Sequence, residues 1–327
     1  MTTSSFRPRR RTLAAFGLGA LTATTAAACS NADPLDQGAG SGGSGSGGSG
    51  SGVGGASDAG GAALVIGSQQ YYSNEIIAEL FAQALEAAGI TVTRQYQIGQ
   101  REVYLPEVES GAIDVMPEYT GNLLQFYQPD APSASPEEIA SALAEALPGE
   151  LRVLDFAEAS DQDTYTTTGD FAQQNQLRTM ADLARVDGLK IAANSEFSTR
   201  PYGPDGLQKT YGATVEVVPV EDSGGPLTVK ALTDGTVQLA DLYSADPAIE
   251  KNGFVVLEDP EALILPQNVV PLVSQKVDEA AAEAIRKVTS VLTATDLRTL
   301  NARSVDEQAK SADIARDWLA EKGITQG

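Results

Sequence analysis

Residues 113–122 (IDVMPEYTGN) combine a carboxylate, an aromatic ring and an amide with the end of a short apolar strand. Ile113–Met116 has the composition of a buried strand, and the Pro117 that follows cannot donate a hydrogen bond to a strand ladder. We therefore expect the strand to end at Met116, and Glu118, Tyr119 and Asn122 to lie on the loop after it. In open α/β sheets, ligand sites lie at the carboxyl ends of strands.

Tyrosines are the second group of residues that could bind a ligand. The chain has ten, and several fall at predicted strand ends or in loops: Tyr71, Tyr72, Tyr119, Tyr165, Tyr202 and Tyr243. Tyrosine rings that converge across a cleft form a cage for a quaternary ammonium, and each ring face contributes about 0.5–2 kcal/mol. For any single one of these residues, a half-buried tyrosine at a lobe edge is the simpler explanation.

The residue types that the chain lacks exclude several classes of enzyme. The sequence has no histidine, which excludes histidine-based triads, histidine-ligated zinc and an imidazole general base. It contains no nucleotide P-loop, and we expect no cofactor and no metal. Catalysis by carboxylates alone stays open, although a chain with 44 acidic residues places some of them near predicted strand ends by chance. Those nearest to such ends are Asp114, Glu118, Asp161 and Asp163.

The formal net charge of −22 argues against two kinds of partner. Nucleic acid would be repelled, and a bilayer of anionic lipids would not hold such a surface. Any contact with a membrane should therefore come from a covalent lipid rather than from the protein surface.

The first 28 residues are organised like a secretory signal peptide. Arg7 and Arg9 to Arg11 form a basic segment, and residues 13–28 form an apolar run that is too short for a comfortable membrane span. Arg10 and Arg11 fit a twin-arginine export signal and a simple basic segment about equally well. We expect residues 1–28 to be removed on export.

Cys29 is the only cysteine, and the three alanines before it resemble a bacterial lipobox. No intramolecular disulfide can form, so lipid attachment is the plainest use for this thiol. Ordinary signal cleavage that leaves a free thiol is the alternative. Residues 29–61 would then form a tether, because residues 38–61 are nearly all Gly and Ser and have a reach of about 25–30 Å. We expect an extracytoplasmic protein that is anchored to the cell membrane by lipid.

From residue 62, short apolar strands alternate with amphipathic helices. We expect strands at 64–66, 91–96, 113–116, 152–156, 190–193, 215–220, 237–242 and 254–257. We expect helices at 73–88, 101–110, 136–147, 180–184, 206–211, 228–234, 278–292 and 305–322. Alternating strands and helices over about 265 residues predict two α/β lobes.

Several segments resemble one family of transport proteins. Residues 67–89 (GSQQYYSNEIIAELFAQALEAAG) and 111–124 (GAIDVMPEYTGNLL) are similar to substrate-binding proteins of glycine betaine/choline/carnitine ABC importers, which carry a PEYTGT motif. The similarity resumes at 163–165, 194–212 and 241–249. The resemblance implies an α/β, two-lobed periplasmic-binding-protein fold of type II, with its lobes joined by a hinge. Lobe 1 would comprise residues 62–164 and 266–327, and lobe 2 residues 165–265.

The resemblance also implies roles for individual residues. Tyr119, Tyr165 and Tyr243 match tyrosines of the ligand cage. Glu196 and Arg200 match an acid and an arginine of the family, and the arginine grips the ligand carboxylate through two parallel hydrogen bonds. The alternative is a helical ion pair between Glu196 and Arg200, worth about a few tenths of a kcal/mol. The proline after Arg200 weakens the helix that such a pair needs.

Three departures from the family pattern bear on the ligand. Gln69 replaces a lysine, Asn122 replaces the threonine of PEYTGT, and Gln267-Asn268 stands where a fourth cage tyrosine is expected. A cage with an open side and added amides indicates a larger or differently decorated ligand than glycine betaine, such as carnitine, choline or ergothioneine. Two neighbouring tyrosines could supply the missing wall: Tyr71 and Tyr72.

The sequence therefore predicts a substrate-binding lipoprotein of an ABC importer, and not an enzyme. We expect it to bind a quaternary-ammonium osmolyte or betaine between its lobes and to deliver it to a permease that works with a separate ATPase. We expect it to act as a monomer and to bind no nucleic acid. One alternative is a receptor for another small cationic or zwitterionic solute, such as ergothioneine or an amino acid. The alternative from another class is a secreted hydrolase that depends on carboxylates.

Overall fold

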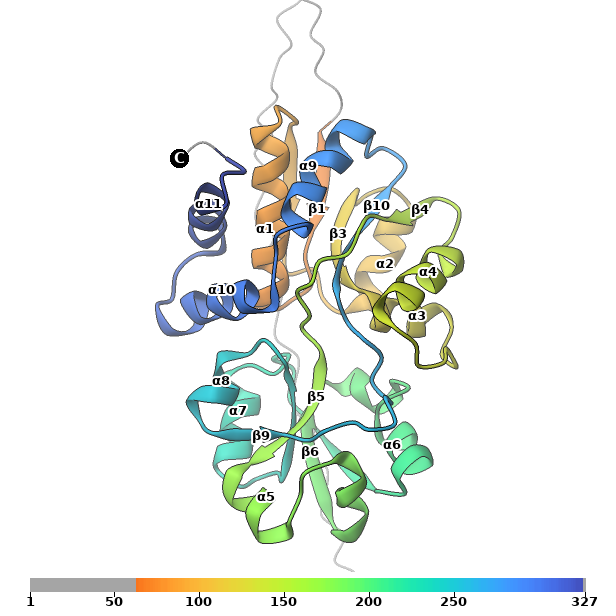
Figure 1. The fold of residues 1–327 in the computed structure, drawn as a ribbon, viewed down its shortest axis with the longest axis vertical. Coiled ribbons are helices and arrows are strands. Elements are labelled where there is room, and N and C mark those ends of the chain that lie inside the picture. The colour runs from red at the N-terminus through yellow and green to blue at the C-terminus, as the bar shows by residue number, and fades with distance from the viewer. Residues whose placement is uncertain (1–62, 326–327) are drawn as a thin grey trace, which may run out of the picture. The chain divides into compact units, whose positions relative to one another are not determined.

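A computed structural model describes residues 63–325 of the chain. The predicted signal peptide (1–28), the predicted lipid attachment at Cys29 and the Gly/Ser linker (29–61) lie outside these residues. The described part forms two α/β lobes, each built on its own five-stranded sheet (Figure 1).

Lobe 1 is built on a mixed sheet with the strand order β2-β1-β3-β10-β4. β1 pairs in parallel with β2 and β3, whereas β10 runs antiparallel to both β3 and β4. The strands are β1 (Leu64–Gly67), β2 (Val92–Gln95), β3 (Val115–Tyr119), β4 (Leu151–Val153) and β10 (Val269–Ser274). The helices of this lobe are α1 (Tyr72–Ala87), α2 (Arg101–Glu109), α3 (Thr120–Tyr127), α4 (Pro136–Ala146), α9 (Glu279–Thr289), α10 (Ala294–Asp306) and α11 (Ser311–Glu321).

Lobe 2 repeats this arrangement with the strand order β7-β6-β8-β5-β9. β6 pairs in parallel with β7 and β8, and β5 runs antiparallel to β8 and β9. The strands are β5 (Asp163–Thr168), β6 (Leu189–Ala193), β7 (Val215–Pro219), β8 (Leu239–Tyr243) and β9 (Phe254–Val256). The helices are α5 (Gly169–Asn175), the 3-10 helices η1 (Met180–Arg185) and η2 (Ser195–Thr199), α6 (Pro204–Tyr211), α7 (Pro226–Thr233) and α8 (Pro247–Lys251).

Each sheet separates two layers of apolar side chains. Because successive residues of a strand point to opposite faces, Val115 of β3 packs with α1 and α9 while Met116 packs with α2, α3 and α4. In lobe 2, Ile191 of β6 lies in the core with η1 and α6, and its neighbour Ala192 lies in the core with α7. The helices on both faces fix where the strand ends point, and those ends carry the candidate site.

The chain passes between the lobes twice. It leaves lobe 1 after β4 and enters lobe 2 at β5, then leaves lobe 2 after β9 and returns at β10 (Figure 1). An isolated bridge between Ser160 and Asn268 joins these two crossover segments. Two adjacent connections of this kind allow the lobes to rotate about them as a hinge.

The prediction that a strand ends at Met116 is wrong, because β3 continues through Pro117 to Tyr119. Pro117 lies opposite Pro271 of β10. Alternate pairs of an antiparallel ladder exchange no N–H bonds, so two facing prolines remove none from it. On its other side, β3 pairs with β1 only at Val115. No strand there lies opposite Pro117, so the N–H that proline lacks costs the sheet no hydrogen bond on this side. Glu118 and Tyr119 are therefore strand residues, while Asn122 lies on α3.

The other main differences concern polar or interrupted segments. The helix expected at 305–322 corresponds to α11, while residues 305 and 306 end α10, a helix that the sequence did not predict. A turn in which Gln308 has a φ of 54° separates the two helices. Neither β5 nor β10 is among the strands expected from the sequence. β5 reads DTYTTT, and its hydroxyls replace apolar groups by bonding to buried carbonyls, as Thr164 does with the carbonyl of Leu242 at 2.6 Å.

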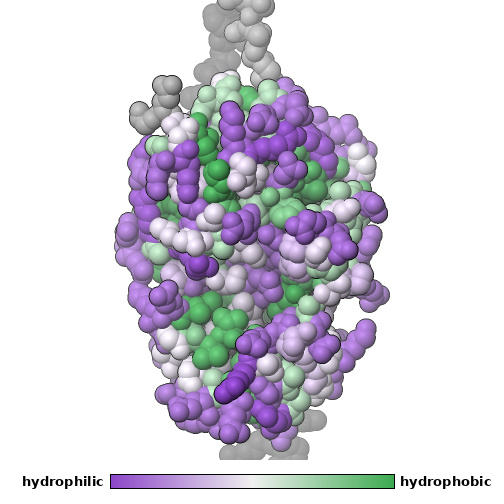
Figure 2. Space-filling view, viewed as in Figure 1, coloured by the Kyte–Doolittle hydropathy of each residue, from purple (hydrophilic) through white to green (hydrophobic). Residues whose placement is uncertain are grey.

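Hydrophilic residues cover most of the face shown in Figure 2, with smaller hydrophobic patches between them. Within residues 63–325, no helix is long and apolar enough to span a bilayer.

Candidate ligand-binding site

A small cavity of about 40 Å³ lies between the lobes, with walls from both. Its lining is dominated by aromatic, carboxylate and guanidinium groups rather than by aliphatic side chains. A larger groove of about 650 Å³ lies elsewhere, between α7, α8 and α10, and contains only one of the predicted site residues, Tyr72. The lining residues of the interlobe cavity are Gln69, Tyr71, Gln100, Arg101, Tyr119, Asn122, Asp161, Asp163, Glu196, Phe197, Arg200, Tyr202, Asp241 and Tyr243.

Four tyrosines line this cavity, two from each lobe, and all are buried except Tyr243, which is partly buried. Tyr71 immediately precedes α1, and Tyr119 is the last residue of β3. Tyr202 lies between η2 and α6, and Tyr243 is the last residue of β8. The rings of Tyr71 and Tyr243 face each other from opposite lobes, with centroids 5.0 Å apart. Burial raises the pKa of all four phenols, so the rings are neutral.

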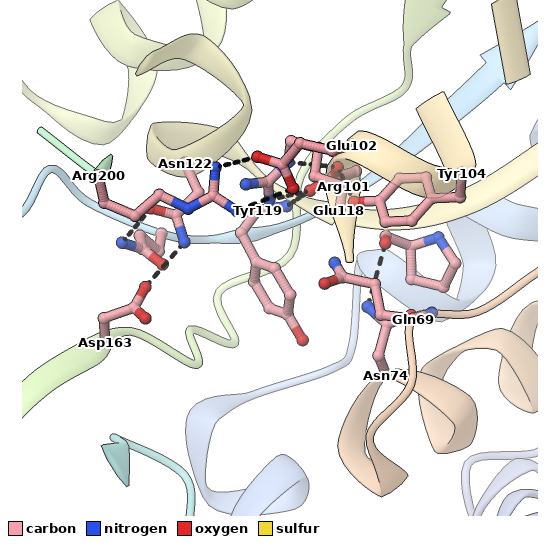
Figure 3. A network of polar contacts seen from close by, with 12 residues as sticks. Gln69, Asn74, Arg101, Glu102, Tyr104, Glu118, Tyr119, Asn122, Asp163 and Arg200 are labelled. Atoms are coloured by element: carbon pink, nitrogen blue, oxygen red, sulfur yellow. Dashed lines mark hydrogen bonds and ion pairs between the residues drawn. The ribbon is translucent and has the colours of Figure 1, made fainter. Parts of the chain in front are cut away.

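Tyr119 is held in place by the side chain that precedes it. Glu118 points to the opposite face of β3 and accepts hydrogen bonds from Nε and Nη2 of Arg101, at 2.9 and 2.8 Å (Figure 3). The hydroxyl of Tyr104 donates a third bond to Glu118, and the backbone N–H of Tyr119 donates a fourth. Burial alone would lower the pKa of Arg101, but Glu118 outweighs it and leaves the pKa above its ordinary value. Arg101 and Glu118 therefore form an ion pair, in which Glu118 offsets the positive charge of Arg101.

Arg200 forms an ion pair that crosses from lobe 2 to lobe 1. Its Nη1 and Nη2 atoms donate to the carboxylate of Glu102 on α2, at 2.7 and 3.3 Å (Figure 3). Arg200 follows η2, which is a 3-10 helix, so Glu196 and Arg200 do not have the i,i+4 spacing of an α-helix. The ion pair of Arg200 is with Glu102 rather than with Glu196. Glu196 lines the cavity without a salt-bridge partner among the described residues, and burial raises its pKa.

Two aspartates from adjacent strands of lobe 2 line the cavity together. Asp163 of β5 is paired with Tyr243 of β8, and Asp241 lies two residues before Tyr243, so both carboxylates occupy the same face of the sheet. Asp163 accepts a hydrogen bond from Nδ2 of Asn122 in lobe 1, at 2.8 Å. The Oδ1 atom of Asp241 is buried and has no hydrogen-bond partner. Burial, followed by the charge of Asp163, raises the pKa of Asp241 well above its ordinary value.

A third aspartate lies on the crossover segment that enters lobe 2. Asp161 accepts hydrogen bonds from the hydroxyl of Ser73 at 2.8 Å and from the backbone N–H of Ala245 at 3.0 Å. Burial nevertheless raises its pKa to about 7. The cavity thus combines aromatic faces with carboxylates that no lysine or arginine of the described residues neutralises.

Seven of the ten predicted ligand-binding residues line the cavity, and three lie outside its lining. Tyr165 lies behind the cavity wall, where its hydroxyl donates to the carbonyl of Tyr202 at 2.8 Å and its ring packs on Phe197. Gln267 donates to Oδ1 of Asn122 at 2.8 Å, and Tyr72 donates to Asp246 at 3.1 Å. The seven that do line it are Gln69, Tyr71, Tyr119, Asn122, Glu196, Arg200 and Tyr243.

The other lining residues are not among these ten. Strand alternation gives a signal for Asp241, because it lies two residues before Tyr243 and so shares its face of β8. Tyr202 was recognised as a loop tyrosine, and Asp161 and Asp163 as carboxylates near strand ends. Gln100, Arg101 and Phe197 carry no signal that separates them from ordinary polar or core residues.

Two α/β lobes that are connected twice and enclose a cavity between them define the type II periplasmic-binding-protein class. The arrangement matches a solved structure described as a glycine betaine/carnitine/choline ABC transporter, with a TM-score of 0.65, 20% identity, and coverage of 80% of this chain and 99% of that one. Residues 62–321 match the family model described as the substrate-binding domain of ABC-type glycine betaine transport systems. The chain belongs to this family.

A curated relative is the glycine betaine-binding protein YehZ of Escherichia coli strain K12. It is 27% identical over 279 residues, which cover 80% of this chain and 91% of YehZ. The apo structure of YehZ matches with a TM-score of 0.58, 26% identity, and coverage of 81% of this chain and all of that one.

Membership of this family settles the class of function. The chain is a solute-binding component of an ABC transporter and not an enzyme, so the hydrolase alternative does not apply. Its partners include a small-molecule ligand and the permease and ATPase of a transporter. Members of the family are extracytoplasmic binding proteins.

Among residues 63–325, no group of three or more His, Cys, Asp or Glu side chains is arranged to hold a metal ion.

Proposed function

We propose that this chain is the extracytoplasmic receptor of an ABC importer and binds a quaternary-ammonium osmolyte or betaine in the interlobe cavity. The observation that carries the proposal is the convergence of four tyrosines from both lobes, three of them buried and one partly buried, on one cavity that also contains unneutralised carboxylates. A quaternary ammonium has no N–H to donate, so aromatic faces hold it without leaving a donor unsatisfied. The carboxylates add attraction for its charge.

The proposed cage consists of Tyr71, Tyr119, Tyr202 and Tyr243. In this cage, Tyr202 replaces Tyr165, which was predicted from the sequence. The hydroxyl of Tyr165 instead donates a hydrogen bond to the carbonyl of Tyr202. The hydroxyl of Tyr119 is buried without a hydrogen-bond partner, which makes it available to a ligand acceptor or a bound water. The amides of Gln69 and Asn122 lie on the same cavity and would contact the polar end of the ligand.

Closure of the lobes accompanies binding in this proposal. Contacts across the cleft already join the lobes: Gln70 donates to Ser223 at 3.0 Å, Asn122 to Asp163 at 2.8 Å and Arg200 to Glu102 at 2.7 Å. A ligand that touches tyrosines of both lobes at once favours the closed arrangement over an open one.

Arg200 is the guanidinium that we propose for a ligand carboxylate, with one condition. Both of its terminal nitrogens are bonded to Glu102, so a carboxylate must displace Glu102 to be gripped. Choline has no carboxylate and leaves the Arg200–Glu102 pair intact. Glycine betaine and carnitine carry one and would compete with Glu102.

The organisation of the whole chain follows from the same proposal. We propose a monomer that is tethered to the membrane by a lipid on Cys29, with residues 29–61 as the linker after a signal peptide of residues 1–28. We place the start of lobe 2 at Asp163 rather than at residue 165, because all of β5 belongs to the second sheet. Lobe 1 then comprises residues 62–162 and 266–327.

A ligand panel tests the proposed function. The melting temperature of the purified protein is measured with glycine betaine, choline, carnitine, ergothioneine, arginine and glucose. A ligand that binds the folded state raises the melting temperature by mass action. We expect at least one quaternary ammonium compound to raise it and glucose to leave it unchanged. A shift with arginine alone would favour a receptor for another cationic solute and overturn the quaternary-ammonium assignment.

A further inference from the structure

The cavity holds more carboxyl groups than its arginines offset. Four carboxylates line it: Asp161, Asp163, Glu196 and Asp241. The two lining arginines are already bound to other carboxylates, Arg101 to Glu118 and Arg200 to Glu102. Among the described residues, none of the four lining carboxylates forms a salt bridge with a lysine or arginine.

Asp163 and Asp241 are neighbours within this group of four carboxylates. They lie on adjacent strands of one sheet face, and each is more than nine-tenths buried, with 6% and 7% of its surface exposed. Asn122 donates to one oxygen of Asp163, whereas Oδ1 of Asp241 is buried and accepts no hydrogen bond from an N–H or O–H group of the described residues. A buried carboxylate oxygen without a donor is unfavourable, and a ligand that supplies a donor or a positive charge removes that penalty.

We propose that the Asp163–Asp241 pair selects ligands of net positive charge, so that the pocket prefers a small cation without a carboxylate to a net-neutral betaine. This inference rests on the proposed function and specifies the class of ligand. A zwitterion brings a carboxylate into a cavity that already holds four. The guanidinium that we propose for that carboxylate, Arg200, is bound to Glu102. A cation such as choline carries a positively charged ammonium group and a hydroxyl donor. Either group can satisfy Oδ1 of Asp241, which lacks a hydrogen-bond donor.

Cation binding is coupled to proton release in this scheme. Burial and the neighbouring Asp163 raise the pKa of Asp241, so the empty pair holds a proton at a pH where a free carboxyl has lost it. A cation stabilises the doubly ionised pair, and the proton leaves Asp241 for the solvent. Affinity for a cation should therefore rise with pH as the pair ionises. The charged or titratable groups around the pair are Asp161, Tyr165, Glu196, Arg200, Tyr202, Tyr243 and Arg101.

Isothermal titration calorimetry with choline and glycine betaine tests the inference. We expect choline to bind at least tenfold more tightly than glycine betaine, and its affinity to increase as the pH is raised. The heat of choline binding should also differ between phosphate and Tris at one pH, because the released proton is taken up by the buffer. Equal affinities for the two ligands with no buffer dependence would overturn the inference.

Variants identify the residues responsible. Asp241→Asn and Asp163→Asn are expected to weaken choline at least tenfold, to abolish the buffer dependence and to weaken glycine betaine by a much smaller factor. Asp234→Asn removes an exposed carboxylate of the same lobe and should change neither ligand. Melting temperatures confirm that each variant folds. An equal loss for both ligands would mean that the aspartates only shape the pocket, and the inference would fail.

The outcomes also separate this inference from the proposed function. If glycine betaine binds as tightly as choline, the protein remains a quaternary-ammonium receptor and only the charge selection is wrong. If no quaternary ammonium compound binds the wild-type protein, both proposals are wrong.

Discussion

At the scale of residues, the cavity combines two kinds of group that attract a cation for different reasons. Tyr71, Tyr119, Tyr202 and Tyr243 offer the negative faces of neutral aromatic rings. The aspartates offer formal charge in a buried setting, where an opposite charge is weakly screened. The burial that makes the aspartates strong partners for a cation also raises the pKa of Asp161 and Asp241 in its absence.

Replacement of single tyrosines should separate the proposed cage from its support. Tyr119→Ala and Tyr202→Ala each remove a ring face worth about 0.5–2 kcal/mol, so we expect affinity for choline to fall by about 2-fold to 30-fold. Tyr165→Phe removes only the hydroxyl that bonds the Tyr202 carbonyl and should change affinity by less than about 3-fold. Calorimetric titration measures all three. Unchanged affinity in Tyr119→Ala and Tyr202→Ala would remove both from the cage.

The raised pKa of Asp161 should appear in the pH dependence of stability. Its pKa is about 7 in the folded protein and about 3.9 in an unfolded chain, so between these values the folded state holds a proton that the unfolded state lacks. Asp161 therefore lowers the free energy of unfolding as pH rises through this window, by up to about 1.4 kcal/mol per pH unit. Urea unfolding of the ligand-free protein at several pH values should show a smaller decline in Asp161→Asn than in the wild type. An equal decline in both would contradict the shifted pKa.

At the scale of elements, strand ends position the site. β3 ends at Tyr119 and β8 ends at Tyr243, and β5 begins at Asp163 opposite Tyr243. Glu118 alternates to the far side of β3, where Arg101 and Tyr104 hold it and fix the direction of the Tyr119 ring. The chain then turns at once into α3, which brings Asn122 to the same cavity.

The turn from β3 into α3 depends on a glycine. A Cβ atom on Gly121 would lie 2.6 Å from the carbonyl oxygen of Pro266 and 2.8 Å from Cβ of Leu265, on the segment that returns from lobe 2. We expect Gly121→Ala to lower the free energy of unfolding by about 1–3 kcal/mol and to weaken ligand binding. Gly149→Ala, where a Cβ atom meets no neighbour within 4 Å, is the matched control. Equal denaturant midpoints for the two variants would show that the contact at Gly121 is tolerated.

Much of the fold was predictable because apolar strands and amphipathic helices leave a periodic signal. The helix at 73–88, with its apolar face, corresponds closely to α1. β5 escaped detection because its buried threonines satisfy their hydroxyls with carbonyls such as that of Gln238, a contact that only the folded sheet supplies. β3 was cut short because the pairing of Pro117 with Pro271 joins residues far apart in the chain.

The site was predictable in part for a similar reason. Tyr119, Tyr243 and Arg200 lie in segments whose letters resemble the family, and all three line the cavity. Tyr165 and Tyr202 are close in space but far apart in the sequence, so nothing in the letters indicates which of them faces the ligand. The Arg200–Glu102 pair joins the two lobes and has no signature in either segment.

At the scale of the whole molecule, the two crossover segments and the contacts across the cleft belong to one mechanism. The crossovers allow rotation, and the contacts between lobes set how stable the closed arrangement is. The Arg200–Glu102 pair is such a contact, with the arginine side chain 13% exposed and the glutamate 49% exposed. Because Glu102 is half exposed, exchange for a ligand carboxylate is feasible.

Changing either partner of this pair should affect ligands according to their charge. Glu102→Gln frees Arg200 for a carboxylate, and we expect affinity for glycine betaine to rise while choline changes little. Arg200→Ala removes the guanidinium and should weaken glycine betaine at least tenfold more than choline. Lys230→Ala, which breaks an exposed pair with Asp234 on lobe 2, is the control for a simple change of charge. Parallel losses for both ligands would mean that Arg200 serves lobe closure alone.

The most direct measurement is a calorimetric titration of the wild-type protein with choline and with 3,3-dimethylbutan-1-ol, which has the same shape and no charge. The central claim is that the interlobe cavity recognises a quaternary ammonium by its charge, through tyrosine faces and aspartates. We expect choline to bind with one site per chain, and the neutral alcohol to bind at least tenfold more weakly. Equal affinity for the two compounds, or no binding of choline or any other quaternary ammonium compound, would contradict the claim.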